Sequence, residues 1–270
     1  MQISVFIDHI LQAVSQTKKS LEDLLKQVKE SGVDGVEANL TYLCEKKKVL
    51  KTLSDAGLKV SCIYEFYEMG IRDEKRRIKK HIKMAKKVGA GRILVVPGFL
   101  SEDEAKEALS YKDDYGKLEA FYDKNAAVRR MVEGITKAVK YGQKHGVTVT
   151  FEDFDLNTSP ICNMNGLKYF FDKVPDLKFT LDMGNFAYIG EDVLAAWDVL
   201  KDYVAHVHCK DRGEGLSSVA TGGGYLPIKE LIEKLKETGY EGYLAIEHFD
   251  MDNQEEAIKD SASFLRECIR

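Results

Sequence analysis

The sequence lacks the features that mark disordered, membrane-spanning or exported proteins. It has only 4 prolines in 270 residues, which argues against a disordered or linker-rich chain. No stretch approaches the roughly 20 consecutive apolar residues of a membrane span. The short apolar run at the N-terminus has no basic segment before it, so we expect neither export nor membrane insertion.

Paired cysteines and a dominant charge are lacking as well. The 5 cysteines are odd in number and scattered, with no CxxC pair, which indicates reduced thiols in a cytoplasmic protein. The 40 basic and 44 acidic residues give a formal net charge of -4. This balance offers no electrostatic reason to expect nucleic acid as a partner. A hydrophobic content of 44% is instead typical of a globular protein.

Short apolar runs of strand length alternate with longer segments of helical periodicity, about eight times in all, which is typical of repeated βα units. The expected strands are residues 3–7, 33–38, 59–63, 92–96, 147–152, 178–182, 205–209 and 243–247. The clearest helical segments are residues 20–30, 75–88, 126–144 and 227–237. Glycines that can end a helix stand at the junctions before the next strand, at Gly32, Gly57, Gly89, Gly146 and Gly239.

About eight such units close more naturally into a barrel than into an open sheet. We therefore predict an α/β chain that forms a single (β/α)8 TIM-barrel domain over residues 1–270, with a doubly wound sheet as the alternative. Two connections are longer than the scheme needs. Residues 97–118 are expected to add a short helix over the barrel mouth, and the Gly- and Ser-rich residues 210–226 are expected to be mobile or ordered by a ligand.

The fifth to eighth expected strands each finish with a residue that can bind a metal. These residues are Glu152, Asp182, His208 and Glu247. Alternate residues of a strand face the same side. If Glu152 points into the barrel, Thr150 also points inward and Phe151 points toward the helices. The same alternation holds in the strands that end at Asp182 and Glu247, so the four side chains can meet at one central point.

Three carboxylates crowded at a barrel mouth repel one another strongly, because the local dielectric is low. A divalent cation would remove this conflict. Three carboxylates and one imidazole suit Mn²⁺, Co²⁺, Mg²⁺ or catalytic Zn²⁺, and differ from a calcium cage or a structural zinc site. The sequence thus predicts one divalent metal ion with positions left open for substrate. Ordinary polar residues that cap strand ends are the alternative.

Four passages resemble the xylose-isomerase-like superfamily of TIM barrels: VTFED, LDMGN, HVHCKD and GGGYLPIKELIEKLKETGYEGYLAIEH. This superfamily includes ketose 3-epimerases, inosose-handling enzymes, hydroxypyruvate isomerases and endonuclease IV, and the resemblance covers essentially the whole chain. It implies that Glu152 and Glu247 bind the metal and also serve as the catalytic acid and base. It implies further that Asp182 and His208 complete the metal site.

The resemblance implies an isomerase or epimerase that acts on a monosaccharide or polyol ketone through proton transfer and an ene-diolate. The small-molecule substrate would be the partner, and a homo-oligomer is compatible with the sequence. A dehydratase acting on an inosose-like substrate would share the ene-diolate. An abasic-site endonuclease like endonuclease IV is a weaker alternative, because it needs a histidine where this chain has Asn185. A sugar-binding protein without turnover is the remaining alternative.

Other polar residues lie near the predicted mouth. Asn185, Lys210 and Arg212 follow the sixth and seventh strands, and we predict that they bind the substrate. His206 shares a strand face with His208, and we favour a buried core role for it over metal binding.

Three residues end early strands, and each is expected to lie behind the metal ligands or to face solvent. They are His9, Glu37 and Glu65.

Overall fold

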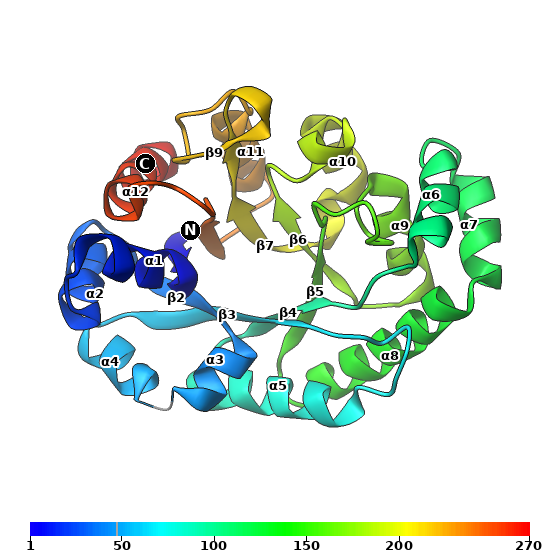
Figure 1. Ribbon diagram of the computed structural model, residues 1–270, viewed down its shortest axis with the longest axis horizontal. Coiled ribbons are helices and arrows are strands. Elements are labelled where there is room, and N and C mark those ends of the chain that lie inside the picture. Colours follow the sequence, from blue (N-terminus) through cyan, green and yellow to red (C-terminus); the bar gives the residue numbers. More distant parts are fainter. Residues whose placement is uncertain (47) are drawn as a thin grey trace.

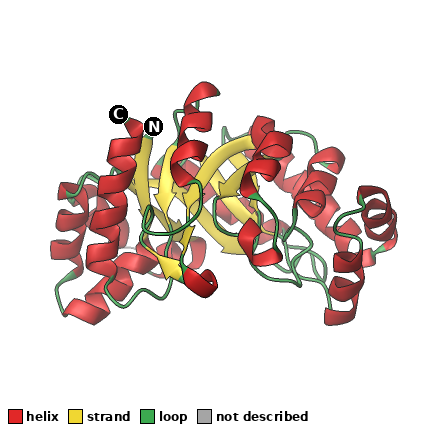
Figure 2. Cartoon of the chain, turned by 90° about the horizontal axis from the view of Figure 1, so that it is seen from above, coloured by secondary structure: helices red, strands yellow, loops and turns green. Residues whose placement is uncertain are grey.

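The computed structural model describes residues 1–46 and 48–270, and in this part of the chain eight parallel strands close into a barrel surrounded by helices (Figures 1 and 2). The order around the barrel is β1, β2, β3, β4, β5, β6, β7 and β10, and β10 pairs with β1. The TIM barrel is confirmed, and the doubly wound sheet is wrong. The barrel strands are β1 (Gln2–Phe6), β2 (Gly35–Asn39), β3 (Lys59–Phe66), β4 (Arg92–Val96), β5 (Thr148–Glu152), β6 (Lys178–Asp182), β7 (Val204–Cys209) and β10 (Tyr243–Ile246).

The helices form the outer layer. They are α1 (Ile7–Thr17), α2 (Leu21–Glu30), α3 (Leu40–Glu45), α4 (Val49–Asp55), α5 (Lys75–Val88), α6 (Glu102–Ser110), α7 (Tyr115–Lys124), α8 (Ala126–Gln143), α9 (Met164–Lys173), α10 (Val193–Leu200), α11 (Ile228–Glu237) and α12 (Gln254–Ile269). Within the described residues, no helix is both long enough and apolar enough to cross a membrane.

Local chemistry explains where several helices begin and end. Ser101 and Glu104 form a capping box at the start of α6, and the Asn125 side chain accepts the backbone N–H of Val128 at the start of α8. The glycines expected at the helix-to-strand junctions all adopt positive φ, between 68° and 92°, as a left-handed helix end requires. They are Gly32, Gly57, Gly89, Gly146 and Gly239.

The predicted alternation of side chains along the strands is confirmed. The Thr180 hydroxyl donates to the Thr150 hydroxyl over 2.7 Å, and both side chains are fully buried. Phe151 points the other way and meets Phe170 of α9, with ring centroids 5.3 Å apart. Polar side chains on one face of these strands therefore occupy the barrel interior, while large apolar side chains fill the layer beneath the helices.

The two longer connections carry structure of their own. The segment after β4 contains both α6 and α7, one helix more than we expected from the sequence. The segment after β7 contains the antiparallel pair β8 (Asp211–Arg212) and β9 (Ser218–Val219), joined through the 3-10 turn η3 (Glu214–Leu216).

Gly142 allows α8 to pack closely against the entry to β5, the strand that carries Glu152. A Cβ atom at Gly142 would lie 2.5 Å from the carbonyl oxygen of Val147 and 3.0 Å from a methyl group of Val149. Gly142→Ala should therefore lower the free energy of unfolding by about 1–3 kcal/mol, as measured by urea denaturation. Gly91→Ala is the control, because a Cβ atom there meets nothing within 4 Å. Equal stability of the two variants would contradict this account.

Candidate metal centre

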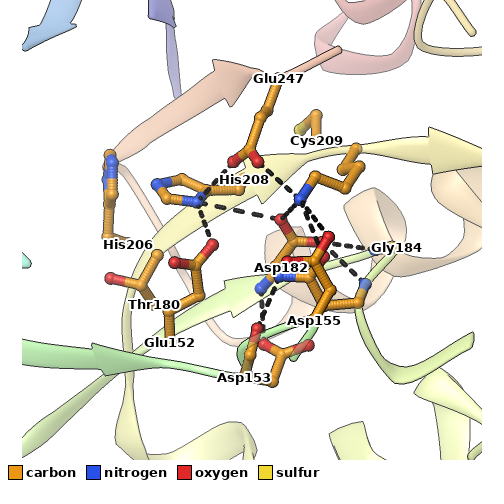
Figure 3. A network of polar contacts seen from close by, with 12 residues as sticks. Glu152, Asp153, Asp155, Thr180, Asp182, Gly184, His206, His208, Cys209 and Glu247 are labelled. Atoms are coloured by element: carbon orange, nitrogen blue, oxygen red, sulfur yellow. Dashed lines mark hydrogen bonds and ion pairs between the residues drawn. The ribbon is translucent and has the colours of Figure 1, made fainter. Parts of the chain in front are cut away.

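The four predicted ligands converge at the carboxyl ends of neighbouring strands. Glu152 and Asp182 end β5 and β6, His208 is the last residue but one of β7, and Glu247 directly follows β10. One ligand atom from each residue lies within 4.8 Å of the others, and all four side chains are buried. Figure 3 shows these side chains pointing toward one another.

The Nδ1 atom of His208 lies at the centre of this cluster. It is 2.8 Å from Oε1 of Glu152, 3.0 Å from Oε2 of Glu247 and 4.0 Å from Oδ2 of Asp182. The single N–H at Nδ1 cannot donate hydrogen bonds to all three oxygens, and it is directed at Oε1 of Glu152. Among the described residues, Oδ2 of Asp182 and Oε2 of Glu247 are buried without a hydrogen-bond partner. Such orphaned acceptors, with a nitrogen beside them, fit a divalent cation.

The pKa values show how strongly these charges interact. Burial raises the pKa of Glu152 to about 8 and the pKa of Asp182 to about 6. Burial also disfavours the anion of Glu247, but the charges of Lys210 and His208 outweigh burial and hold the pKa of Glu247 below its usual value. Burial opposes charge on His208, yet the neighbouring glutamates raise its pKa well above the usual value. A proton on His208 thus balances the carboxylates, and a metal bound at Nδ1 would replace that proton.

Behind His208, the Glu37 carboxylate joins two histidines. Its Oε2 accepts from Nε2 of His206 over 2.8 Å and from Nε2 of His208 over 3.2 Å. Burial raises the pKa of Glu37, but the two histidines outweigh burial and bring it down to about 2. With Nε2–H of His208 held in this way, Nδ1 faces the carboxylates.

Glu37, His206 and His208 lie close enough together to form a second metal-binding group, but hydrogen bonding accounts for them. Arg92 donates to Nδ1 of His206 over 3.3 Å, and a guanidinium can only donate. Burial lowers the pKa of His206 to about 4, so its ring is neutral and Nε2 carries the hydrogen. Neither ring nitrogen of His206 keeps a free lone pair. His206 is completely buried, and its hydrogen bonds agree with the favoured core role.

The residues predicted to bind substrate lie beside the cluster, but each is bonded to protein groups. The Asn185 side chain donates to the Asp153 carbonyl over 2.6 Å and accepts from Lys210 over 2.8 Å. Arg212 is 3.0 Å from Asp155 and donates to the Gly184 carbonyl over 3.2 Å. Asn185 and Arg212 thus support the walls of the site.

Two acidic residues of this network were missed from the sequence. Asp153 accepts the backbone N–H of Asp182 over 2.9 Å, and burial raises the pKa of Asp153 well above its usual value. Asp155 is partly exposed and pairs with Arg212. Their position in the FEDFD passage, directly after Glu152, was the available signal.

His9 lies in α1 rather than at the end of a strand, and neither His9 nor Glu65 is among the four clustered ligands. Nε2 of His9 accepts the backbone N–H of His248 over 3.0 Å, which supports the end of β10. Glu65 accepts from the Thr41 hydroxyl and from the backbone N–H of Phe66, and in the described part of the chain it belongs to neither candidate metal group. Of the three residues expected behind the metal ligands or facing solvent, Glu37 alone touches a ligand side chain among the described residues.

Asp211 organises the Gly-rich connection after β7. Its buried carboxylate accepts backbone N–H groups at four positions, over distances of 2.8 to 3.2 Å. The donors are Arg212, Gly222, Gly224 and Leu226. Gly224 has to be glycine here, since a Cβ atom would lie 2.2 Å from an Asp211 carboxylate oxygen. Protein contacts made by Asp211 thus hold this segment.

Comparisons with known proteins agree with the barrel fold. The model of a family described as xylose isomerase-like TIM barrel matches residues 25–268. The fructoselysine 3-epimerase of Shigella flexneri is 25% identical over 67% of this chain, and the match spans 63% of that protein, less than two thirds of its length. The inosose dehydratase of Mesomycoplasma hyopneumoniae is 22% identical, over 93% of this chain and 89% of that protein.

Solved structures share the fold. The crystal structure of the probable 3-DHS dehydratase AsbF from Bacillus anthracis superimposes with a TM-score of 0.74 at 15% identity, and the alignment covers 98% of this chain and 99% of that chain. At this identity the likeness supports the barrel architecture alone.

Asp211→Ala should loosen the connection after β7, because four backbone N–H groups would lose a charged acceptor. Hydrogen exchange followed by mass spectrometry should show faster exchange in residues 212–226 and unchanged exchange in the barrel strands. Glu214→Ala is the control, since Glu214 lies in the same connection and is exposed. Unchanged protection in Asp211→Ala would refute the proposed anchoring role.

Glu37→Gln should weaken the binding of a divalent cation such as Mn²⁺ about 10- to 100-fold, because the orientation and basicity of His208 depend on the carboxylate behind it. Isothermal titration calorimetry measures the affinity. Glu65→Gln, a buried glutamate on the neighbouring strand, should bind Mn²⁺ like the wild type. If both variants lose affinity equally, the effect does not come from the contact between Glu37 and His208.

Proposed function

This chain belongs to the xylose isomerase-like TIM-barrel family, and we propose that it is a divalent-metal-dependent isomerase or epimerase of a monosaccharide or polyol ketone. The observation that carries this proposal is the convergence of three buried carboxylates and one imidazole at the barrel mouth. The similarity to a fructoselysine 3-epimerase supports the substrate class. We propose that a small sugar or polyol is the partner, and that no nucleic acid is bound.

In this proposal Glu152, Asp182, His208 and Glu247 hold one Mn²⁺, Co²⁺, Mg²⁺ or Zn²⁺ ion. When bound, the ion supplies a Lewis acid that draws electron density from substrate oxygens and so stabilises an ene-diolate. The donor set suits these ions, since it mixes oxygen with nitrogen and contains no thiolate.

Glu152 is well placed to move the proton at the carbon next to the carbonyl. Its Oε1 contacts His208, while its Oε2 makes no hydrogen bond among the described residues. Burial raises the pKa of Glu152, and its unbonded Oε2 would be the atom that takes up and returns the proton. Glu247 would complete the pair of proton carriers on the opposite side of the substrate, as the family pattern implies.

A dehydratase is the second candidate, and the extended match to an inosose dehydratase favours it specifically. Both reactions begin when a proton leaves the carbon next to a carbonyl, and they differ in whether a hydroxide then departs. Mass spectrometry of the product separates them, because dehydration removes one water from the substrate mass and isomerisation leaves the mass unchanged.

An abasic-site nuclease finds less support. In this superfamily, abasic-site cleavage resembles the chemistry of a site with several metal ions. Here hydrogen bonds among Glu37, His206 and Arg92 account for the second candidate metal-binding group. Asn185 also stands where the nuclease pattern has a histidine, and its side chain bonds the Asp153 carbonyl.

Glu152→Gln and Glu247→Gln should each lower turnover by about 10²–10⁴-fold, because general acid–base catalysis typically contributes that much. The assay screens ketoses and inososes with the Mn²⁺-loaded protein and follows both product formation and deuterium uptake from solvent. Glu65→Gln serves as the folded control, and treatment of the wild type with a chelator should abolish turnover. Near-normal rates in both site variants would eliminate the mechanism.

A further inference from the structure

Lys210 is the one cation that reaches the ligand cluster in the described part of the chain, and its side chain is almost completely buried. Its Nζ atom is 2.6 Å from Oε1 of Glu247, 2.8 Å from Oδ1 of Asn185 and 3.4 Å from Oδ2 of Asp182. An ammonium group has three N–H donors. Lys210 thus pairs with Glu247, donates to Asn185 and lies within ion-pair distance of Asp182, so it contacts the ligand set directly.

The two oxygens of Glu247 have different partners as a result. Oε1 is paired with Lys210, while Oε2 lies 3.0 Å from Nδ1 of His208 and has no hydrogen bond. Asp182 is divided in the same way, since its Oδ1 accepts the backbone N–H groups of Gly184 and Asn185 and its Oδ2 faces the cluster. Each carboxylate thus has one oxygen fixed by the protein and one presented to the centre.

The surroundings of Lys210 hold it in this position. Asn185, which accepts from Lys210, is itself fixed through the Asp153 carbonyl. Gly184 makes room for the lysine stem, because a Cβ atom there would lie 2.9 Å from Cγ of Lys210. The lysine side chain is therefore confined between β6 and the ligands.

We propose that Lys210 is a positioning residue that holds Oε1 of Glu247, so that Glu247 presents only Oε2 to the metal ion. This inference rests on the proposed metal site. The charge of Lys210 and its contact with Glu247 have opposite effects on metal binding. A lysine so near a cation repels it, so removing the positive charge alone should strengthen metal binding. If Lys210 positions Glu247, removing the lysine should instead weaken metal binding, because Glu247 would lose the geometry that binding needs.

The test compares Lys210→Met with Lys210→Gln, measured against wild type by Mn²⁺ titration calorimetry without substrate. Both variants remove the charge, but glutamine keeps N–H donors and methionine has none. We expect Lys210→Met to weaken Mn²⁺ binding about 10- to 100-fold and Lys210→Gln to recover part of that loss. Tighter or unchanged binding in Lys210→Met, or equal affinities in the two variants, would overturn the positioning role.

Gly184→Ala is a second perturbation that leaves the charge in place, because a Cβ atom there would press on both Cγ and the backbone carbonyl oxygen of Lys210, each 2.9 Å away. It should also weaken Mn²⁺ binding, and wild-type affinity in this variant would count against the proposal. Circular dichroism checks that each variant is folded. If the wild type binds no divalent ion, the proposed function itself fails. If the wild type binds one ion per chain and the variants match it, only the role of Lys210 fails.

Discussion

The electrostatic conflict among three buried carboxylates governs the centre of this molecule. Glu152, Asp182 and Glu247 would repel one another at the barrel mouth unless positive charge lay between them. The protein provides that charge in two ways, through the imidazole of His208 and the ammonium group of Lys210. Residues behind His208 and beside Lys210 contact these two positive groups in turn. Glu37 balances His208 from behind, and Asn185 fixes the lysine. Negative and positive groups therefore alternate from Glu37 through His208 and the three carboxylates to Lys210.

Much of the fold could be predicted because its signals are local. The alternation of strand and helix patterns indicated each barrel strand to within two residues at its start, and β4 and β6 have the predicted bounds. Glycine at the helix ends and the inward direction of Thr150 follow from backbone geometry that short sequence windows encode. The convergence of the four ligands followed from closing the barrel, since neighbouring strand ends then lie side by side.

What escaped prediction depends on side chains that meet from distant parts of the chain. The pairing of Glu37 with His206 joins residues 169 positions apart, and no periodicity indicates it. The sequence placed Lys210 near the mouth. Its ion pair with Glu247 depends on the space beside Gly184 and on the rotamer of the long lysine side chain. Arg212 and Asn185 were predicted to contact substrate because both are polar and lie at the mouth, and the sequence did not indicate the hydrogen bonds that they make to the protein.

Closure of the barrel has a consequence for how the molecule matures. The strand that precedes Glu247 is the last of the barrel, and it pairs with β1, while α12 packs against α1 (Figure 1). A nascent chain that has already folded its first seven barrel strands still lacks one of the four predicted ligands, and β1, which pairs with β2, still lacks its second neighbour. A metal ion that needs all four ligands would bind fully only to the closed barrel, and would therefore stabilise finished barrels over partly assembled ones.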